Sequence, residues 1–221
     1  MMHLIPLVAV ASLLLMPPVS AAQEYRVYNS TQDFFSVAFP GDPAIETTTQ
    51  LSEYHGVFPT RVYSLASPRG RFSVTVVDYT DAERIHTERV KSCPPDAQSE
   101  CAGDDQAIFG IGSWRYDVQS AQDQAARGFL LRDAKVTHFS WAVVDRVPGR
   151  QIHLTNADRS RTFVAIHMHE GRLYTLEATV PAGAPEPGLF QQSLQFLDRD
   201  GRPIRYAQIY VVGQPAPGRL R

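Results

Sequence analysis

The stretch from Thr60 to Tyr79, TRVYSLASPRGRFSVTVVDY, decides the fold of this chain. Thr60 to Ala66 and Arg71 to Tyr79 are rich in β-branched and aromatic residues, and apolar residues recur in the second run with a period of two. Ser67-Pro68-Arg69-Gly70 between them is typical of a turn. Two strands joined by so short a turn must be antiparallel, because a parallel pair needs a long crossover.

The same pattern extends toward the N-terminus. Phe35 to Phe39 alternates apolar and small residues, and Pro40-Gly41-Asp42-Pro43 ends that run. Ala44 to Ser52 contains three consecutive threonines, whose β-branching favours a pleated surface. Tyr25 to Tyr28 is expected to form a short extended lead-in. Together these segments predict an antiparallel meander rather than β-α-β units.

Helical spacing occupies the middle of the chain, and strands then return. Asp81 to Lys91 is expected to form a short helix, and a longer helix from about Asp117 to Arg132 is expected to lay an apolar stripe on the sheet. Strands are expected at Val136 to Val147, Gln151 to Thr155, Thr162 to His169 and Arg172 to Val180, with turns at Pro148-Gly149 and Glu170-Gly171. A helix is expected at Gly188 to Leu197 and a last strand at Ile204 to Val212.

These elements predict an α+β fold, an antiparallel β-sheet flanked by helices. Residues 23–206 are expected to form a single domain, because that length suits one hydrophobic core. Residues 207–221 are expected to form a partly flexible C-terminal tail, and residues 1–22 a signal peptide.

Three segments resemble a known family. Phe34 to Pro43, FFSVAFPGDP, resembles the opening strand of PsbP/Mog-like exported proteins; Gly171 to Leu176 resembles their late hairpin, and Phe190 to Phe196, FQQSLQF, their closing helix. The resemblance covers about residues 25–200 and implies an α/β/α sandwich. It also implies partner binding rather than catalysis, since most family members bind partners. No functional residue of the family maps onto this chain.

The N-terminus predicts export. Residues 1–22 contain no charged side chain, run apolar from Leu4 to Met16, and end in small residues, so that cleavage is expected near Ala21 or Ala22. The apolar run is too short to cross a bilayer comfortably. We therefore expect a periplasmic or extracellular protein with no membrane span after cleavage of the signal.

Cys93 and Cys101 are the two cysteines of the chain and flank a proline-containing, turn-rich loop. In an oxidising compartment a disulfide between them is the expected state. Zinc would need further ligands, and no histidine lies at ligand spacing near this loop.

Charge composition argues against a role with nucleic acids. The formal net charge is −2, whereas non-specific binding to a phosphate backbone requires a basic surface. Most basic residues are arginine. Arg69, Arg71, Arg159 and Arg161 are candidates for bidentate contacts with phosphate or carboxylate, although the codon bias of a GC-rich genome is the simpler explanation of their number.

His167 and His169 are weak candidates for metal ligands. Residues two apart on a strand project to one side, so both imidazoles would lie together beside the Glu170-Gly171 turn, where His153 or His138 could complete a site. The alternative is two exposed polar residues at the end of a hairpin. No cofactor is predicted, and no metal is required by the pattern.

Other short motifs carry less information. Gly110 to Trp114, GIGSW, departs from both the serine-hydrolase elbow and the dinucleotide fingerprint. Asp198 to Gly201 lacks the alternating oxygen ligands of a calcium loop. The aromatic residues of the strands are expected to form the core, and the alternative is that some of them line an apolar pocket. The residues concerned are Phe34, Phe35, Phe39, Tyr63, Phe72, Tyr79, Phe139, Trp141, Phe163 and Tyr174.

The sequence therefore predicts an exported, non-enzymatic binding module that engages an envelope protein partner through one face of its sheet or through the Cys93–Cys101 loop. The first alternative is a periplasmic carrier of a small hydrophobic ligand or lipid. The second is a metal-binding protein built around His167 and His169.

Overall fold

The structure is a computed structural model that describes residues 25–94 and 112–220. Among these residues the larger sheet has seven strands in the order β3-β4-β5-β9-β8-β7-β6, and every neighbouring pair is antiparallel. The strands are β3 (Ala44–Leu51), β4 (Val57–Ser67), β5 (Gly70–Asp78), β6 (Ala134–Val144), β7 (Val147–Asn156), β8 (Arg161–His169) and β9 (Arg172–Val180). The predicted α+β class with an antiparallel sheet is confirmed.

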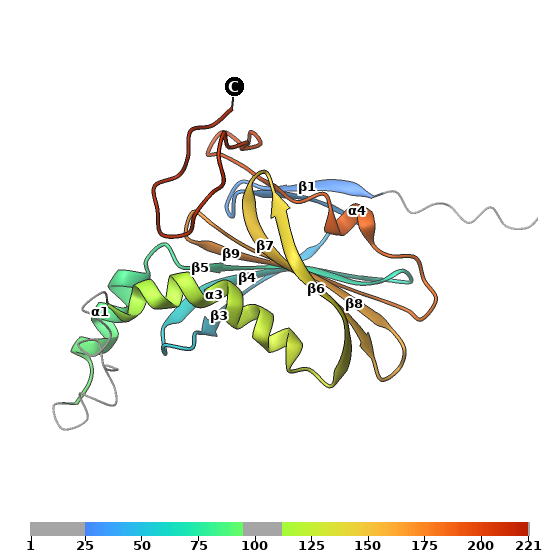
Figure 1. Ribbon diagram of the computed structural model, residues 1–221, viewed down its shortest axis with the longest axis horizontal. Helices are drawn as coiled ribbons and strands as arrows, with labels where there is room; N and C mark the ends of the chain where they lie inside the picture. The colour runs from blue at the N-terminus through green and yellow to red at the C-terminus, as the bar shows by residue number, and fades with distance from the viewer. Residues whose placement is uncertain (1–24, 95–111, 221) are drawn as a thin grey trace, which may run out of the picture.

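Helices lie on one face of this sheet (Figure 1). Helix α1 (Ala82–Lys91) and helix α3 (Ser113–Leu130) cover an apolar core that includes Phe58, Ile152 and Ile166. Helix α3 begins four residues before the expected start at Asp117. Its face toward the sheet carries Ala121, Ala126 and Phe129, as the helical spacing indicated.

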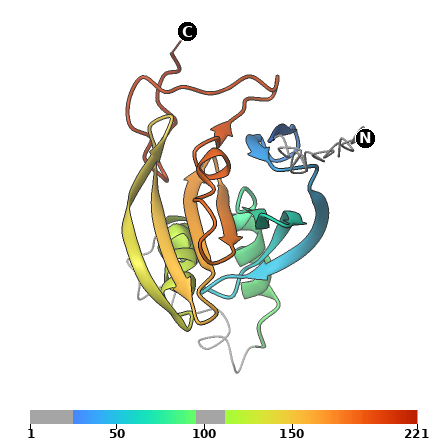
Figure 2. The ribbon, with the colours of Figure 1, turned by 90° about the vertical axis from the view of Figure 1, so that its right-hand side faces the viewer.

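The opposite face is covered by a different set of elements (Figures 1 and 2). A small sheet orders β1 (Arg26–Ser30), β2 (Phe35–Phe39) and β10 (Gln195–Phe196), and the four-residue helix α4 (Gly188–Gln191) and the C-terminal segment lie beside it. Aromatic side chains fill the space between the sheets, including Phe35, Tyr174 and Phe196, so this second core is tightly packed.

Two expected elements differ in the structure near the C-terminus. Gly188 to Leu197 is not one helix, because the chain leaves the helical path after Gln191 and pairs with the edge of β2 as β10. Ser193 favours this path, since its hydroxyl accepts a hydrogen bond of 2.8 Å from the amide of Ala38 in β2. Ile204 to Val212 makes an isolated bridge at Tyr206 instead of a strand.

The turn expected at Pro148-Gly149 lies three residues earlier. Asp145 and Arg146 form it with φ angles of 48° and 67°, and Pro148 and Gly149 belong to β7. Gly149 has a packing role, because a Cβ atom there would lie 2.4 Å from the ring of His167. The other predicted hairpin turn, Glu170-Gly171, is confirmed.

The prediction of an aromatic core holds for most of these residues, but Phe34 is half-buried and lies outside both cores, and Phe139 and Trp141 are exposed. Phe139 and Trp141 on the edge strand β6 are 51% and 69% exposed, because α3 does not extend over that edge. The C-terminal segment carries Tyr206 and Tyr210, which are buried against the second core.

Candidate functional site

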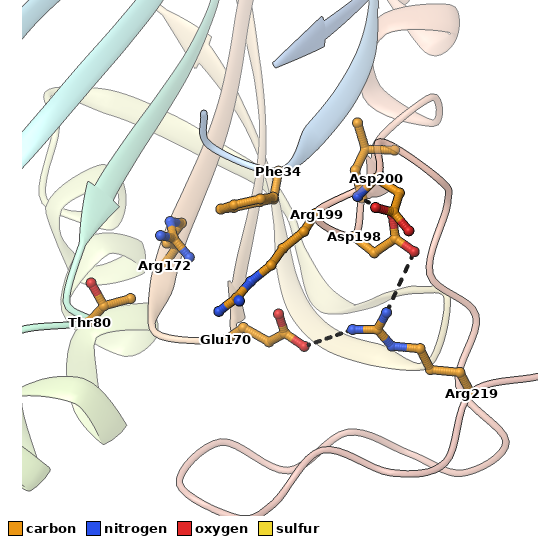
Figure 3. Close-up of a pocket in the computed structure, with 9 residues that line it drawn as sticks. Phe34, Thr80, Glu170, Arg172, Asp198, Arg199, Asp200 and Arg219 are labelled. Carbon is orange, nitrogen blue, oxygen red and sulfur yellow. Dashed lines mark hydrogen bonds and ion pairs between the residues drawn. The ribbon is translucent and has the colours of Figure 1, made fainter. Parts of the chain in front are cut away.

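A cleft opens at one end of the larger sheet, where the β8–β9 turn meets the start of β2 and the turn after β10 (Figure 3). It has a volume of about 720 Å³ and is named here the polar cleft. Its lining residues come from five separate segments of the chain: Phe34, Thr80, Glu170, Arg172, Leu197, Asp198, Arg199, Asp200 and Arg219. Three arginines and three carboxylates thus share one hollow.

The β8–β9 turn sets the floor of the polar cleft. Glu170 and Gly171 adopt φ angles of 43° and 74°, the conformation of a tight two-residue hairpin. The carbonyl oxygen of Gly171 accepts a hydrogen bond of 2.8 Å from the amide of Tyr79. This bond fixes the turn against the end of β5, and so fixes Glu170 and Arg172 on either side of the turn.

The carboxylates of the cleft already have partners. Glu170 accepts a hydrogen bond of 3.2 Å from the Tyr206 hydroxyl and lies 3.4 Å from Arg219. Asp198 accepts hydrogen bonds of 2.9 Å from the backbone amides of Asp200 and Arg202, and these amides lower the pKa of Asp198. The acceptor side of the cleft is therefore occupied by the protein itself.

The donor side is open. Arg172 stacks its guanidinium 4.9 Å from the Phe34 ring centre and lies 3.6 Å from Asp78, but its buried Nε has no hydrogen-bond partner. Arg199 is exposed and reaches across the cleft from the turn after β10 (Figure 3). In residues 25–94 and 112–220, Arg199 forms no ion pair and no hydrogen bond. Such free N–H groups suit an incoming anion.

A buried ion pair supports the wall formed by Phe34. Asp33 accepts two hydrogen bonds from Arg61, of 2.7 and 2.6 Å, and one of 2.5 Å from the Tyr63 hydroxyl. The carboxylate raises the pKa of Arg61, and burial together with Asp33 raises the pKa of Tyr63. Phe34 itself has a φ of 53°, which is strained for a bulky residue, so the neighbouring pair holds it in place.

His167 and His169 lie under the cleft rather than at the surface. Both point to the same side of β8, as the period of two indicated, but both are buried, so the interpretation as exposed residues is wrong. His169 Nε2 lies 2.8 Å from the Tyr206 hydroxyl, and its ring lies 4.3 Å from that of Phe196. Burial lowers the pKa of His167 to about 4 and that of His169 to about 3.

The other two histidine candidates pair with each other instead. The rings of His138 on β6 and His153 on β7 lie 4.7 Å apart and do not approach the His167 and His169 pair. Across the described part of the chain, no three His, Cys, Asp or Glu side chains gather in an arrangement that could hold a metal ion. The residues that the structure describes thus supply no third ligand for the metal hypothesis.

Sequence patterns did not reveal a buried hydrogen-bonded chain between the helices. His86 of α1 lies 2.9 Å from the Asp117 carboxylate and 3.2 Å from the Ser113 hydroxyl, both on α3. Ser52, in the β3–β4 connection, donates a hydrogen bond of 2.5 Å to the same carboxylate. His86, Ser113 and Asp117 are buried. The hydrogen bonds join α1, α3 and the β3–β4 connection, so they hold these three elements together.

Two further predictions lie wholly or partly outside the described residues. The signal peptide falls in residues 1–24. Cys93 is buried just after α1, with Sγ 3.3 Å from the carbonyl oxygen of Arg89, whereas Cys101 is not described. The disulfide and the cleavage site stay predictions. No helix in residues 25–94 and 112–220 has the length and apolar composition needed to cross a membrane.

Comparison with known proteins gives one kind of match. No family model matches the chain, and no curated protein matches it. Among solved structures it is similar to cyanobacterial PsbP (CyanoP) from Synechocystis sp. PCC 6803, with 13% identity, a TM-score of 0.41, and coverage of 82% of this chain and 96% of that chain. This structure bears the name of the family that the sequence resembles, and the likeness carries nothing about ligands or partners.

Proposed function

We propose that this chain is an exported, non-enzymatic binding module that takes an acidic segment of an envelope protein partner into the polar cleft. Its fold is then a variant of the PsbP/Mog-like α/β/α sandwich in which a small sheet and α4 replace much of one helical layer. One observation supports the proposal above the others. The cleft pairs its own carboxylates internally, whereas within the described residues the Nε of Arg172 and the guanidinium of Arg199 have no acceptor.

The chemistry of the two arginines favours a carboxylate. A guanidinium presents its donors in a planar fork that matches a carboxylate, and charge-assisted hydrogen bonds of this kind are stronger than neutral ones. Arg172 is held by stacking on Phe34, so little side-chain entropy is lost when it binds. Arg199 is exposed and free to close over the bound group. An Asp or Glu side chain of a partner could therefore accept hydrogen bonds from Arg172 and Arg199 together.

The proposal is tested by reversing the charge of Arg199. Tagged wild-type protein and Arg199→Glu are each used to capture partners from envelope extract, and the captured proteins are quantified by mass spectrometry. We expect a partner retained by the wild type to fall at least tenfold with Arg199→Glu, because a carboxylate would then face a carboxylate. The same partner should be lost as salt is raised.

Lys135→Glu is the matched control. It makes the same change in net charge at a distant place. Lys135 of β6 pairs with Thr155 of β7, Thr155 pairs with Arg161 of β8, and Arg161 pairs with Val180, the last residue of β9, whereas Arg172 is the first. A set of captured proteins that is the same for wild type, Arg199→Glu and Lys135→Glu contradicts the proposal. Equal losses with both variants also contradict it, because the effect then comes from net charge alone.

A second candidate function, the carriage of a small hydrophobic ligand, is supported by a different observation. An apolar pocket of about 540 Å³ lies at the far end of β9 from the polar cleft, within the size range of small-molecule sites. The third hypothesis, a metal site at His167 and His169, has no comparable support in the described residues.

A further inference from the structure

The pocket at the far end of β9, named here the apolar pocket, has a hydrophobic floor. Phe72 of β5, Val180 at the end of β9 and Pro187 before α4 are all buried and form this floor. Tyr25 and Leu189 stand at its sides, and the Tyr25 ring packs edge-on against Phe72 at 6.4 Å. Apolar walls on several sides suit a hydrocarbon chain.

The rim of the apolar pocket carries one cation without an acidic partner. Arg69 lies in the β4–β5 turn, and its guanidinium stacks 5.6 Å from the ring centre of Tyr25. Within the described residues it forms no ion pair. The acidic residue of the rim, Glu186, already lies 3.5 Å from Arg161. The charge left for a ligand to neutralise is therefore positive.

The loop over the pocket is held in place by the protein. Arg161 of β8 donates a hydrogen bond to the carbonyl oxygen of Ala184 and pairs with Glu186. The amide of Gly188 donates a hydrogen bond of 2.9 Å to the carbonyl oxygen of Glu186. A pocket whose wall is already fixed loses little entropy when it binds a ligand.

We propose that the apolar pocket binds an amphipathic monocarboxylate with a medium-length acyl chain, whose carboxylate pairs with Arg69 and whose chain lies on Phe72, Val180 and Pro187. This inference deepens the second candidate function by naming its ligand class and the residue that recognises the head group. It does not depend on the polar cleft, so a result that contradicts the proposal for one site does not affect the proposal for the other.

The direct test is calorimetric titration of the purified protein with octanoate, hexanoate and octanol. Octanoate is expected to bind about tenfold more tightly than hexanoate, because two more methylene groups leave water. It is also expected to bind more tightly than octanol, because octanol lacks the charge that Arg69 recognises. No octanoate binding at millimolar concentration, or equal affinity for octanoate and octanol, would overturn the proposal.

Two variants separate the chain site from the head-group site. Gly188 lies in the pocket with open space where a Cβ would stand, so Gly188→Leu should fill the pocket and abolish octanoate binding. Gly218→Leu is the matched control, since Gly218 also has open space at Cβ but lies outside the pocket. Arg69→Gln should weaken octanoate about tenfold and leave octanol unchanged.

The outcomes of these variants decide the proposal. Circular dichroism first checks that each variant has the fold and melting temperature of the wild type. Octanoate affinity that survives Gly188→Leu, or that falls equally with Gly218→Leu, overturns the pocket as the site. Affinity that is unchanged in Arg69→Gln overturns the assigned head-group contact. Binding to phosphatidylglycerol vesicles without binding to octanoate would show a membrane surface instead, and would also overturn it.

Discussion

The two ends of β9 offer different kinds of surface on the same face of one sheet. Arg172 at the first residue borders the polar cleft, and Val180 at the last borders the apolar pocket, so eight residues of strand separate them by about 27 Å. Tyr174, Leu176 and Ala178 lie between them on the same face and are packed in the core. A single strand thus presents two sites that a solid aromatic core keeps apart.

What differs between the ends is how each is held. The polar cleft depends on directional contacts, such as Asp33 with Arg61 behind Phe34 and Glu170 with Arg219. The apolar pocket depends on packing of Phe72 and on a proline-containing loop tied to Arg161. Directional polar contacts respond to charge and pH, whereas apolar packing responds little to either. The polar cleft should therefore respond more strongly to charge and pH than the packed floor of the apolar pocket.

The largest expected effect is at the support of the polar cleft. Asp33→Asn removes the charge that faces Arg61 and leaves a guanidinium that is only 20% exposed without its partner. Breaking a buried pair in this way costs about 3–5 kcal/mol of the free energy of unfolding. Urea denaturation of the wild type and Asp33→Asn measures this loss.

Ligand binding locates that effect along β9. If Asp33→Asn remains folded, we expect partner capture at the polar cleft to weaken while octanoate binding at the apolar pocket persists. Arg26→Gln is a suitable control, because Arg26 is exposed and lies 4.0 Å from Asp42, so its loss should cost little. A stability of Asp33→Asn within about 0.5 kcal/mol of the wild type would contradict the role assigned to the buried pair.

Acid should weaken the polar end next. His167 and His169 are held neutral in the folded protein, with pKa values lowered to about 4 and about 3, whereas an unfolded histidine titrates near 6.5. Below pH 6.5 the unfolded chain binds protons that the folded chain does not, so stability falls as pH is lowered. Each histidine should cost about 2 kcal/mol by pH 5.

Substitution of His169 tests whether its protonation contributes to the loss of stability at low pH. Urea denaturation at pH 7 and pH 5 should show a smaller difference for His169→Phe than for the wild type, because phenylalanine keeps a ring against Phe196 and cannot be protonated. His138→Phe, at an exposed position on β6, should retain the wild-type difference. Equal stability of the wild type at both pH values would contradict the assignment.

Local patterns along the chain predicted the sheet well, because alternation and turn chemistry act over a few residues. The β4–β5 and β8–β9 hairpins were predicted near their observed bounds. The Pro148-Gly149 turn was misplaced because glycine there serves close packing against His167 rather than a turn. The helix expected after Gly188 was cut short by pairing with β2, a contact between segments far apart in the sequence.

The polar cleft carried no such local signal. Phe34, Arg172, Arg199 and Arg219 come from four segments, and only the fold brings them together. Arg199 lies in the Asp198 to Gly201 turn, whose sequence does not match a calcium-binding loop. Arg219 lies in a segment that was expected to be a partly flexible tail. The apolar pocket could be predicted in part, because the sequence already makes Arg69 a candidate for carboxylate binding. The apolar neighbours of Arg69 come from distant segments, so only the fold identifies them.

The smallest expected effect concerns the contact of the C-terminal segment with the polar cleft. Arg219 lies 3.4 Å from Glu170 and 3.7 Å from Asp198, and its side chain is 46% exposed, so Arg219→Gln should lower the free energy of unfolding by less than about 1 kcal/mol. That difference should shrink further in 0.5 M salt, because exposed charges are screened there at about 4 Å. Octanoate binding at the apolar pocket should be unchanged at either salt concentration. A loss well above 1 kcal/mol that persists in salt would contradict this prediction. It would show instead that Arg219 supports the packing of Tyr206 and Tyr210 in the core, and both ends of β9 would then depend on the same packed core.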